Sequence, residues 1–525
     1  MLVIYLVQLV NPGERYMGDR GSNNSLVSRR KFLGLSASVA AGAALSGVGA
    51  GLLSGCGSNE WKASRYHRVV FHNCGVFDGI RPYLQRGLGV VVEWGRIGAV
   101  TAQWELENLE GATYIDLKGA TLMPGMIDNH VHITVPFMYD VNLDTILQMD
   151  DQIRKNFKSC VMKGVTTVRD LGGFPGKIKK FKELSDNYEI PGPRVYSSLS
   201  PIAAREGERM GAPEKAPYFT NPVIKWLLGG NYAERAENLE EIETACGEMI
   251  SRGALWLKTL HQDHSYSYNP RPLPDHSEEG YRLIARLAHE NGLKCALHEP
   301  LLSGFRMGVA TGFDTLEHMP MDGIIPDRYI EKFVKQDMAM VPTLMAYGDV
   351  FIEDELLKMV EKRGEEFLVP EAVKQMKKEL QKSLAQEKED LSMDERKKLI
   401  FDRQYLKDMH ENQVANLQKL YRAGATIAPG TDLGGYYSGF FGRFTEELKR
   451  YVNAGIPNGE VLKMATYGNA KVLDRHNRIG SIKPAMYADL IVVDGNPLED
   501  ISTLDRVKMV MKGGGIMRMD EGLST

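Results

Sequence analysis

The chain has 525 residues, which is enough for one large domain and a smaller one. Its 43% hydrophobic and 25% charged residues are typical of a globular protein, and a formal charge of −4 gives no reason to expect nucleic acid as a partner. The five cysteines show no Cys-x-x-Cys spacing, which argues against a disulfide framework and a structural zinc knuckle. Four of them lie in or near apolar runs, where we expect buried thiols.

Residues 1–55 have the features of a targeting segment. Ser28-Arg29-Arg30-Lys31-Phe32-Leu33 resembles a twin-arginine export signal, and the stretch that follows it is too rich in glycine and serine for a stable membrane span. Leu53-Ser54-Gly55-Cys56 then resembles a bacterial lipobox. The alternative is an Ala/Gly-rich disordered leader.

The two resemblances predict export by the twin-arginine route and a mature chain that begins at Cys56 with a lipid on its thiol. We therefore expect a lipoprotein that faces the periplasm or the cell exterior and is held at the membrane by its lipid anchor alone. Met17 is a second candidate translation start, and residues 1–16, which precede it, are then an over-extension of the gene.

Both ends of the mature chain contain short β-branched runs between turn residues, which are typical of strands. They predict a small β-sandwich domain made of residues 56–122 and residues 476–525. The expected strands are residues 68–72, 89–93, 96–100, 112–116, 488–494 and 507–511.

Residues 123–475 alternate between strand-like and helix-like runs, and residues 236–251 and 277–291 are two of the expected helices. This rhythm predicts an α/β fold, a TIM-like (β/α)8 barrel, in which chemistry gathers at the C-terminal ends of the strands. Nearly half of residues 351–400 are charged, which indicates a solvated helical insertion between strands seven and eight. The strands are expected to end near His132, Arg169, Ala203, Lys258, His298, His318, Leu344 and Asp432.

Polar residues at these strand ends suggest a metal site. His130 and His132 stand at positions i and i+2 of a strand, so both side chains leave by the same face and can bind one ion. The candidate partners at the other strand ends are Lys258, His298, His318 and Asp432.

Several motifs then occur in a fixed order along the chain. They are Leu122-Met123-Pro124-Gly125-Met126-Ile127-Asp128-x-His130-x-His132, Gly164-Val165-Thr166-Thr167-Val168-Arg169-Asp170, Leu316-Glu317-His318, Pro429-Gly430-Thr431-Asp432, Ala465-Thr466-x-x-Asn469-Ala470 and Gly480-Ser481-Ile482-Lys483-Pro484. With these motifs, residues 66–515 resemble the amidohydrolase superfamily, in the branch of imidazolonepropionase-like proteins and metal-dependent dipeptidases of the prolidase type.

The resemblance implies two divalent metal ions, with zinc the expected metal. His130, His132 and Asp432 are expected to hold one ion, and His298 and His318 the other. In this family a lysine at the end of strand four is often carboxylated, which would make Lys258 an anionic bridge between the ions. Burial favours the neutral amine that this reaction needs.

We expect cleavage of a carbon–nitrogen bond in a small amide, cyclic amide or dipeptide. Asp432 is the predicted catalytic residue, which takes a proton from the attacking water and delivers it to the leaving nitrogen. Two alternatives stay open: a one-metal cyclic-amide hydrolase or deaminase in which Lys258 binds no metal, and a non-catalytic surface lipoprotein. His298-Glu299-Pro300 departs from the pattern of dipeptidase-like relatives, and the sequence leaves the oligomeric state open, a homo-oligomer included.

Overall fold

The structure is a computed structural model that describes residues 64–65, 67–106, 108–135, 143–204, 230–387, 391–398, 402–434 and 439–523. The predicted export segment and Cys56 lie outside these residues. Among the described helices, none combines the length and the apolar character that crossing a membrane requires.

Strands from both ends of the described chain form two sheets that share one core. The first has the order β5-β4-β2-β6, and the second has the order β1-β20-β19-β18-β7-β3. Phe71, Val92, Leu122, Leu490 and Met509 belong to one buried cluster between them. The bounds are β1 Ser64–Arg65, β2 Arg68–His72, β3 Gly75–Val76, β4 Leu88–Glu93, β5 Arg96–Ala102, β6 Thr113–Asp116, β7 Thr121–Pro124, β18 Leu490–Val493, β19 Val507–Lys512 and β20 Gly515–Met519.

Two further sheets contain the parallel strands. One has the order β10-β9-β8 and the other the order β12-β11-β13-β14-β15-β16-β17. Most of these strands are buried along their whole length, which explains their unbroken apolar runs. The bounds are β8 Met126–Val131, β9 Val165–Asp170, β10 Arg194–Ser197, β11 Ile202–Ala203, β12 Glu234–Arg235, β13 Trp256–Leu260, β14 Lys294–His298, β15 Thr315–Glu317, β16 Ala339–Val341 and β17 Thr426–Ile427.

Backbone hydrogen bonds connect these two parallel sheets at both edges. At one edge the Leu255 amide, which precedes β13, donates to the Ser197 carbonyl of β10 over 2.9 Å. At the other edge the Asn129 amide of β8 donates to the Pro429 carbonyl over 3.0 Å, and the His132 amide donates to the Leu433 carbonyl over 2.8 Å. The segment after β17 therefore lies directly beside the end of β8.

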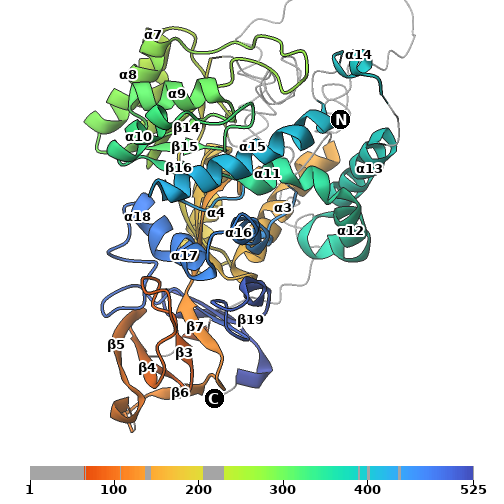
Figure 1. Cartoon of the computed structure of the whole chain (residues 1–525). Helices are drawn as coiled ribbons and strands as arrows, with labels where there is room; N and C mark the ends of the chain where they lie inside the picture. The colour runs from red at the N-terminus through yellow and green to blue at the C-terminus, as the bar shows by residue number, and fades with distance from the viewer. Residues whose placement is uncertain are drawn as a thin grey trace, which may run out of the picture. The chain divides into compact units, whose positions relative to one another are not determined.

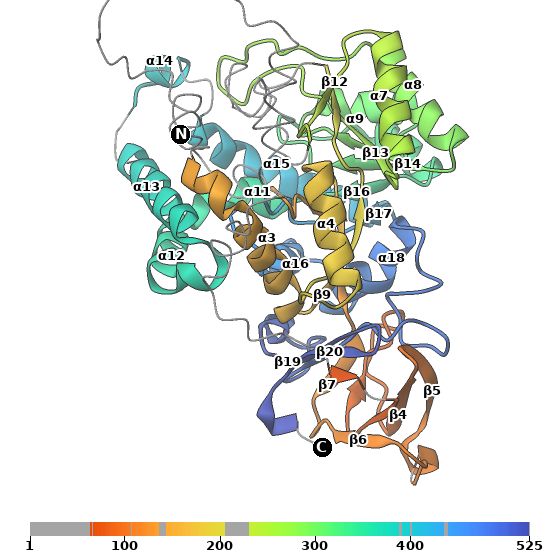
Figure 2. The same ribbon diagram turned by 180° about the vertical axis from the view of Figure 1, so that it is seen from behind.

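Helices separate most of the parallel strands along the chain, so the fold is mixed α/β. In Figure 1, α7, α8, α9 and α10 flank strands β14 to β16, and Figure 2 shows α3 and α4 beside β9. The bounds are α3 Leu143–Met162, α4 Pro175–Asp186, α7 Leu239–Ser251, α8 Glu278–Glu290, α9 Leu302–Thr311, α10 Asp327–Lys335, α11 Leu344–Gly348, α15 Arg403–Arg422, α16 Phe444–Asn453, α17 Asn458–Lys463 and α18 Asn469–Val472.

The charged insertion contains two longer helices and a short one, α12 Glu353–Phe367, α13 Pro370–Glu387 and α14 Met393–Arg396. Helices α12 and α13 lie side by side in both views (Figures 1 and 2) and bury Leu356, Val360 and Met376 in one apolar cluster. Their charged residues fill the other faces, as the interleaved charges indicate.

Two strand ends differ from the sequence-based expectation. The strand expected to end near Leu344 stops at Val341, because Thr343 adopts a left-handed backbone with φ of 45° and α11 begins at Leu344. The strand expected to end at Asp432 stops at Ile427, and Asp432 follows in an irregular segment. Both expectations extended a short apolar strand through the polar segment that follows it.

Candidate active site

All six predicted ligands lie in the second half of a parallel strand, at its centre or in the segment that follows it. Because parallel strands end at the same edge of a sheet, these residues converge although up to 302 positions separate them in the sequence. The ligands and the strands that position them are His130 and His132 (β8), Lys258 (β13), His298 (β14), His318 (β15) and Asp432 (after β17).

His130, His132 and Asp432 form the tightest group. The Asp432 Oδ1 atom lies 3.0 Å from His132 Nε2 and 3.3 Å from His130 Nε2. One donor atom from each of the three residues lies within 4.8 Å of the other two, which is the spacing that a single metal ion requires. This is the first ion site that the sequence predicts.

His298 and His318 lie next to this group. The ring centroids of His298 and His318 are 4.4 Å apart, and those of His130 and His318 are 5.0 Å apart. The four predicted histidine ligands therefore form one continuous cluster of rings.

The backbone is strained where two of the candidate ligands stand. His318 has φ of 78° and Asp432 has φ of 59°, a left-handed conformation that costs about 1–3 kcal/mol at a residue other than glycine. Such strain persists only where the surrounding structure enforces it, and here it turns both side chains toward the cluster.

Gly430 lets the Asp432 segment approach β8. A Cβ atom at this position would lie 2.8 Å from the His130 backbone nitrogen and 2.7 Å from Val341 Cγ1, closer than real Cβ contacts. The close approach of this segment to β8 therefore requires a residue without a Cβ atom at the glycine of the Pro-Gly-Thr-Asp motif.

A buried ion pair orients His130. The His130 Nδ1–H donates to Glu317 Oε2 over 2.8 Å, which leaves Nε2 facing Asp432. The Arg169 guanidinium donates to both Glu317 oxygens, over 2.8 and 2.9 Å, and stacks 4.5 Å over the Trp256 ring. Carboxylates that fix the tautomer of a ligand histidine in this way tune metal affinity.

Sequence reasoning missed the roles of Arg169 and Glu317, although both stand in the motifs. Each of these residues is a charged side chain within an apolar run, in Val-Arg-Asp and in Leu-Glu-His. Because a charged side chain is rarely buried without a partner, both positions indicated a buried ion pair. Nothing in the sequence says that these two charges, 148 residues apart, pair with each other.

The other histidines also have fixed orientations. The His132 Nδ1–H donates to the Gly172 carbonyl over 2.7 Å, and His318 Nδ1 lies 2.7 Å from the Thr343 hydroxyl. Asp170 accepts the Gly172 amide and so supports the turn that holds His132. Burial raises the pKa of Asp170 to about 6.

The charges at the centre suit metal binding. Burial lowers the pKa of His130 to about 4 and that of His318 well below its ordinary value, which favours the neutral imidazole that coordinates metal. Burial opposes ionisation of Asp432, but the charges of the neighbouring histidines outweigh it and hold the pKa of this carboxyl well below its usual range. For His132, the contact with Asp432 outweighs burial and raises the pKa.

Lys258 is buried, with 2% of its surface exposed, and its Nζ atom has no hydrogen-bond partner among the described residues. Burial is the main cause that lowers its pKa to about 8. A buried amine without a hydrogen-bond partner is costly unless a group outside the protein chain completes the site.

Glu299, where the sequence departs from the pattern of dipeptidase-like relatives, is a second buried ionisable residue whose side chain has no hydrogen-bond partner among the described residues. Glu299 is fully buried, neither of its carboxyl oxygens has a hydrogen-bond partner among the described residues, and burial raises its pKa well above the ordinary value. The structure therefore places a fully buried carboxyl group, whose pKa burial raises, directly after His298.

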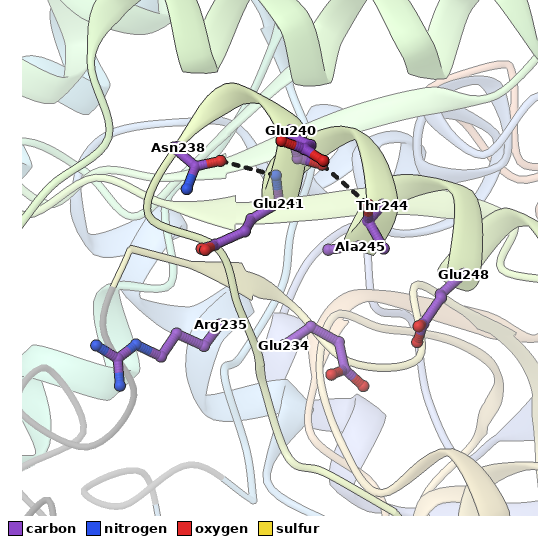
Figure 3. A pocket seen from close by; sticks show the side chains of 8 residues that line it. All are labelled: Glu234, Arg235, Asn238, Glu240, Glu241, Thr244, Ala245 and Glu248. Atoms are coloured by element: carbon purple, nitrogen blue, oxygen red, sulfur yellow. Dashed lines mark hydrogen bonds between the residues drawn. The ribbon is translucent and has the colours of Figure 1, made fainter.

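A separate surface cavity of about 360 Å³ lies along β12 and the start of α7 (Figure 3), and none of the six predicted ligands lines it. Four of its eight lining residues are glutamates, and hydrogen bonds of the α7 N-terminus, such as that from the Glu241 amide to Asn238, occupy its rim. These bonds are those of an ordinary helix cap.

Comparison with known proteins now identifies the class. The sequence profile of the amidohydrolase family matches residues 121–517, so the chain belongs to the amidohydrolase family. It is therefore a hydrolase that acts on carbon–nitrogen bonds, and the family generally binds metal ions.

Individual relatives are distant. The ochratoxinase of Aspergillus niger is 24% identical over 414 residues, which cover 76% of this chain and 75% of the relative. Its crystal structure matches with a TM-score of 0.66 at 20% identity, covering 87% of this chain and 97% of that one. A crystal structure of a Xaa-Pro dipeptidase with bound methionine matches with a TM-score of 0.65 at 22% identity, covering 86% and 99%. These structures share the α/β fold of this chain.

Proposed function

We propose that this protein is a metal-dependent amidohydrolase that cleaves a small amide or dipeptide-type substrate with the help of two divalent ions. The observation that carries the proposal is the buried Lys258 amine, which has no hydrogen-bond partner among the described residues and lies close enough to Asp432 and His318 for their charges to interact. Imidazole and carboxylate donors suit zinc. The donor set therefore fits the metal that the family implies.

His130, His132 and Asp432 would hold one ion, and His298 and His318 the other. The neutral Lys258 amine would add to carbon dioxide and release a proton, giving an anionic carbamate that would help His298, His318 and Asp432 to hold the ions. When bound, the ions would lower the pKa of water to about 7 and polarise the substrate carbonyl.

The chain itself would supply orientation and proton transfer. Glu317 and Gly172 keep the Nε2 atoms of His130 and His132 directed into the site. Asp432, ionised by its histidine neighbours, accepts a proton from the attacking water and returns it to the leaving nitrogen, which then departs as an amine.

The substrate class rests on the relatives. The Xaa-Pro dipeptidase and the ochratoxinase, by their names, act on a dipeptide and on ochratoxin. We propose a small peptide or amide for this chain as well.

We also propose the finer architecture. The strand order and the hydrogen bonds at both edges of the parallel sheets support a closed (β/α)8 barrel, and the shared apolar cluster of the two smaller sheets supports a β-sandwich. Twin-arginine export and lipidation of Cys56 remain proposals, which mass spectrometry of the protein from its native membrane would test.

The test is a metal count together with reconstitution. The protein freed of metal by a chelator should recover amide hydrolysis with zinc only when bicarbonate is also added, and elemental analysis should then give two ions per chain. Lys258→Arg, which forms no carbamate and keeps the positive charge, should bind less metal and ignore bicarbonate. One ion per chain and full activity without bicarbonate would support the one-metal alternative instead.

A further inference from the structure

We propose that His289, Cys295 and Asp314 form a second metal-binding site, separate from the candidate active site. The three residues come from the C-terminal end of α8, from β14 and from the residue that precedes β15. Together they offer an imidazole, a thiol and a carboxylate, a donor set that suits zinc and cobalt.

The donor atoms converge on one point. The Asp314 Oδ2 atom lies 2.9 Å from His289 Nε2 and 3.4 Å from Cys295 Sγ, and the sulfur lies 4.0 Å from His289 Nε2. A tetrahedral zinc ion with ordinary bond lengths has donor atoms about 3.3–3.6 Å apart. If these donor atoms moved by a few tenths of an ångström, they would occupy three of the four ligand positions of such a site.

The surroundings hold these donors in place without a metal. The Cys295 amide donates to Asp314 Oδ2 over 2.8 Å, and the Asp314 amide donates to the Cys295 carbonyl over 3.1 Å. The thiol and the imidazole also direct hydrogen bonds to the same carboxylate oxygen, so all three side chains are already aimed at one another.

The site is open on one side. Cys295 is buried, whereas the side chains of His289 and Asp314 are 48% and 26% exposed. An ion can therefore enter from solvent and keep a water molecule as its fourth ligand. Binding would release the thiol proton to solvent, because the thiolate is the form that coordinates metal.

The proposed second site is separate from the candidate active site. Cys295 and His298 stand on the same strand, three residues and about 10 Å apart, near its opposite ends. An ion bound by Cys295 would connect the end of α8 to two neighbouring strands.

Cobalt distinguishes the two sites, because none of the six predicted active-site ligands contains sulfur. Metal-free protein titrated with Co²⁺ under reducing conditions should develop a near-ultraviolet thiolate-to-cobalt charge-transfer band. The band should disappear in Cys295→Ser and persist in Cys74→Ser, a matched control whose buried thiol lies between β2 and β3, in the core of the small sheets. Amide hydrolysis plays no part in this readout.

A second variant guards against misfolding of Cys295→Ser. His289→Ala changes a half-exposed side chain, so the fold should tolerate it, and the Co²⁺ affinity read from the charge-transfer band should fall by about tenfold or more. A wild-type protein that shows no such band at saturating Co²⁺ would overturn the proposal. So would a band that survives in Cys295→Ser or an affinity that His289→Ala leaves unchanged.

Discussion

Glu317→Gln tests whether the buried ion pair behind His130 supports both the fold and the metal site. Glu317 is fully buried, accepts two hydrogen bonds from Arg169 and receives the Nδ1–H of His130. The substitution keeps the size of the side chain but removes its charge and replaces one acceptor oxygen by a donor. The Arg169 guanidinium would then lose the carboxylate that accepts its hydrogen bonds.

Two magnitudes follow from this geometry. Removing one partner of a buried ion pair costs about 3–5 kcal/mol, and we expect the lower end because the amide oxygen of the substituted side chain still accepts one hydrogen bond. The amide nitrogen can also donate to His130 Nδ1, which moves the imidazole proton to Nε2 and blocks the atom that would bind metal. Loss of such support lowers metal affinity by about 10- to 100-fold.

The assay is urea unfolding of the metal-free protein, followed by competition for zinc with a chelating dye. Glu331→Gln, a change of the same kind at an exposed position of α10, is the control and should match the wild type in both. If Glu317→Gln unfolds at the wild-type urea concentration and binds zinc with unchanged affinity, the pair neither stabilises the fold nor orients His130.

Three further changes have defined outcomes. Asp432→Asn removes the proposed proton acceptor, so kcat should fall by about 10²- to 10⁴-fold with metal bound, and near-native turnover would refute the assignment. Arg194→Leu deprives the buried Asp489 carboxylate of its two guanidinium hydrogen bonds, so the free energy of unfolding in urea should fall by about 3–5 kcal/mol, and an unchanged midpoint would contradict this. Burial raises the pKa of Glu447 to about 7, so between about pH 4 and about pH 7 the folded state keeps a proton that the unfolded state releases. Glu447 should therefore lower wild-type stability by up to about 3 kcal/mol as the pH rises through that window, and Glu447→Gln should abolish this contribution; equal pH slopes for both proteins would disprove it.

Much of this protein can be derived from local sequence patterns. The apolar runs predicted most strands of the small sheets and of the parallel sheets, because burial selects side chains along each strand separately, but they missed short strands such as β1, β3 and β12. The candidate ligand residues could also be identified from the sequence, since His130 and His132 lie two positions apart and the others lie in or after apolar runs. The ends of the strands were predicted less accurately, because Thr343 and Asp432 adopt left-handed backbone conformations that no local sequence pattern indicates.

Tertiary structure decided which of these residues meet. Glu317 and Arg169 each look like an isolated charge in an apolar strand, and only the sheet order shows that they pair behind His130. No local pattern joins His289 and Cys295 to Asp314 either, because ligand spacing along a chain reveals a metal site only when the ligands share one local element. Contacts between different strands and helices depend on how the sheets assemble, and that information exists only in three dimensions.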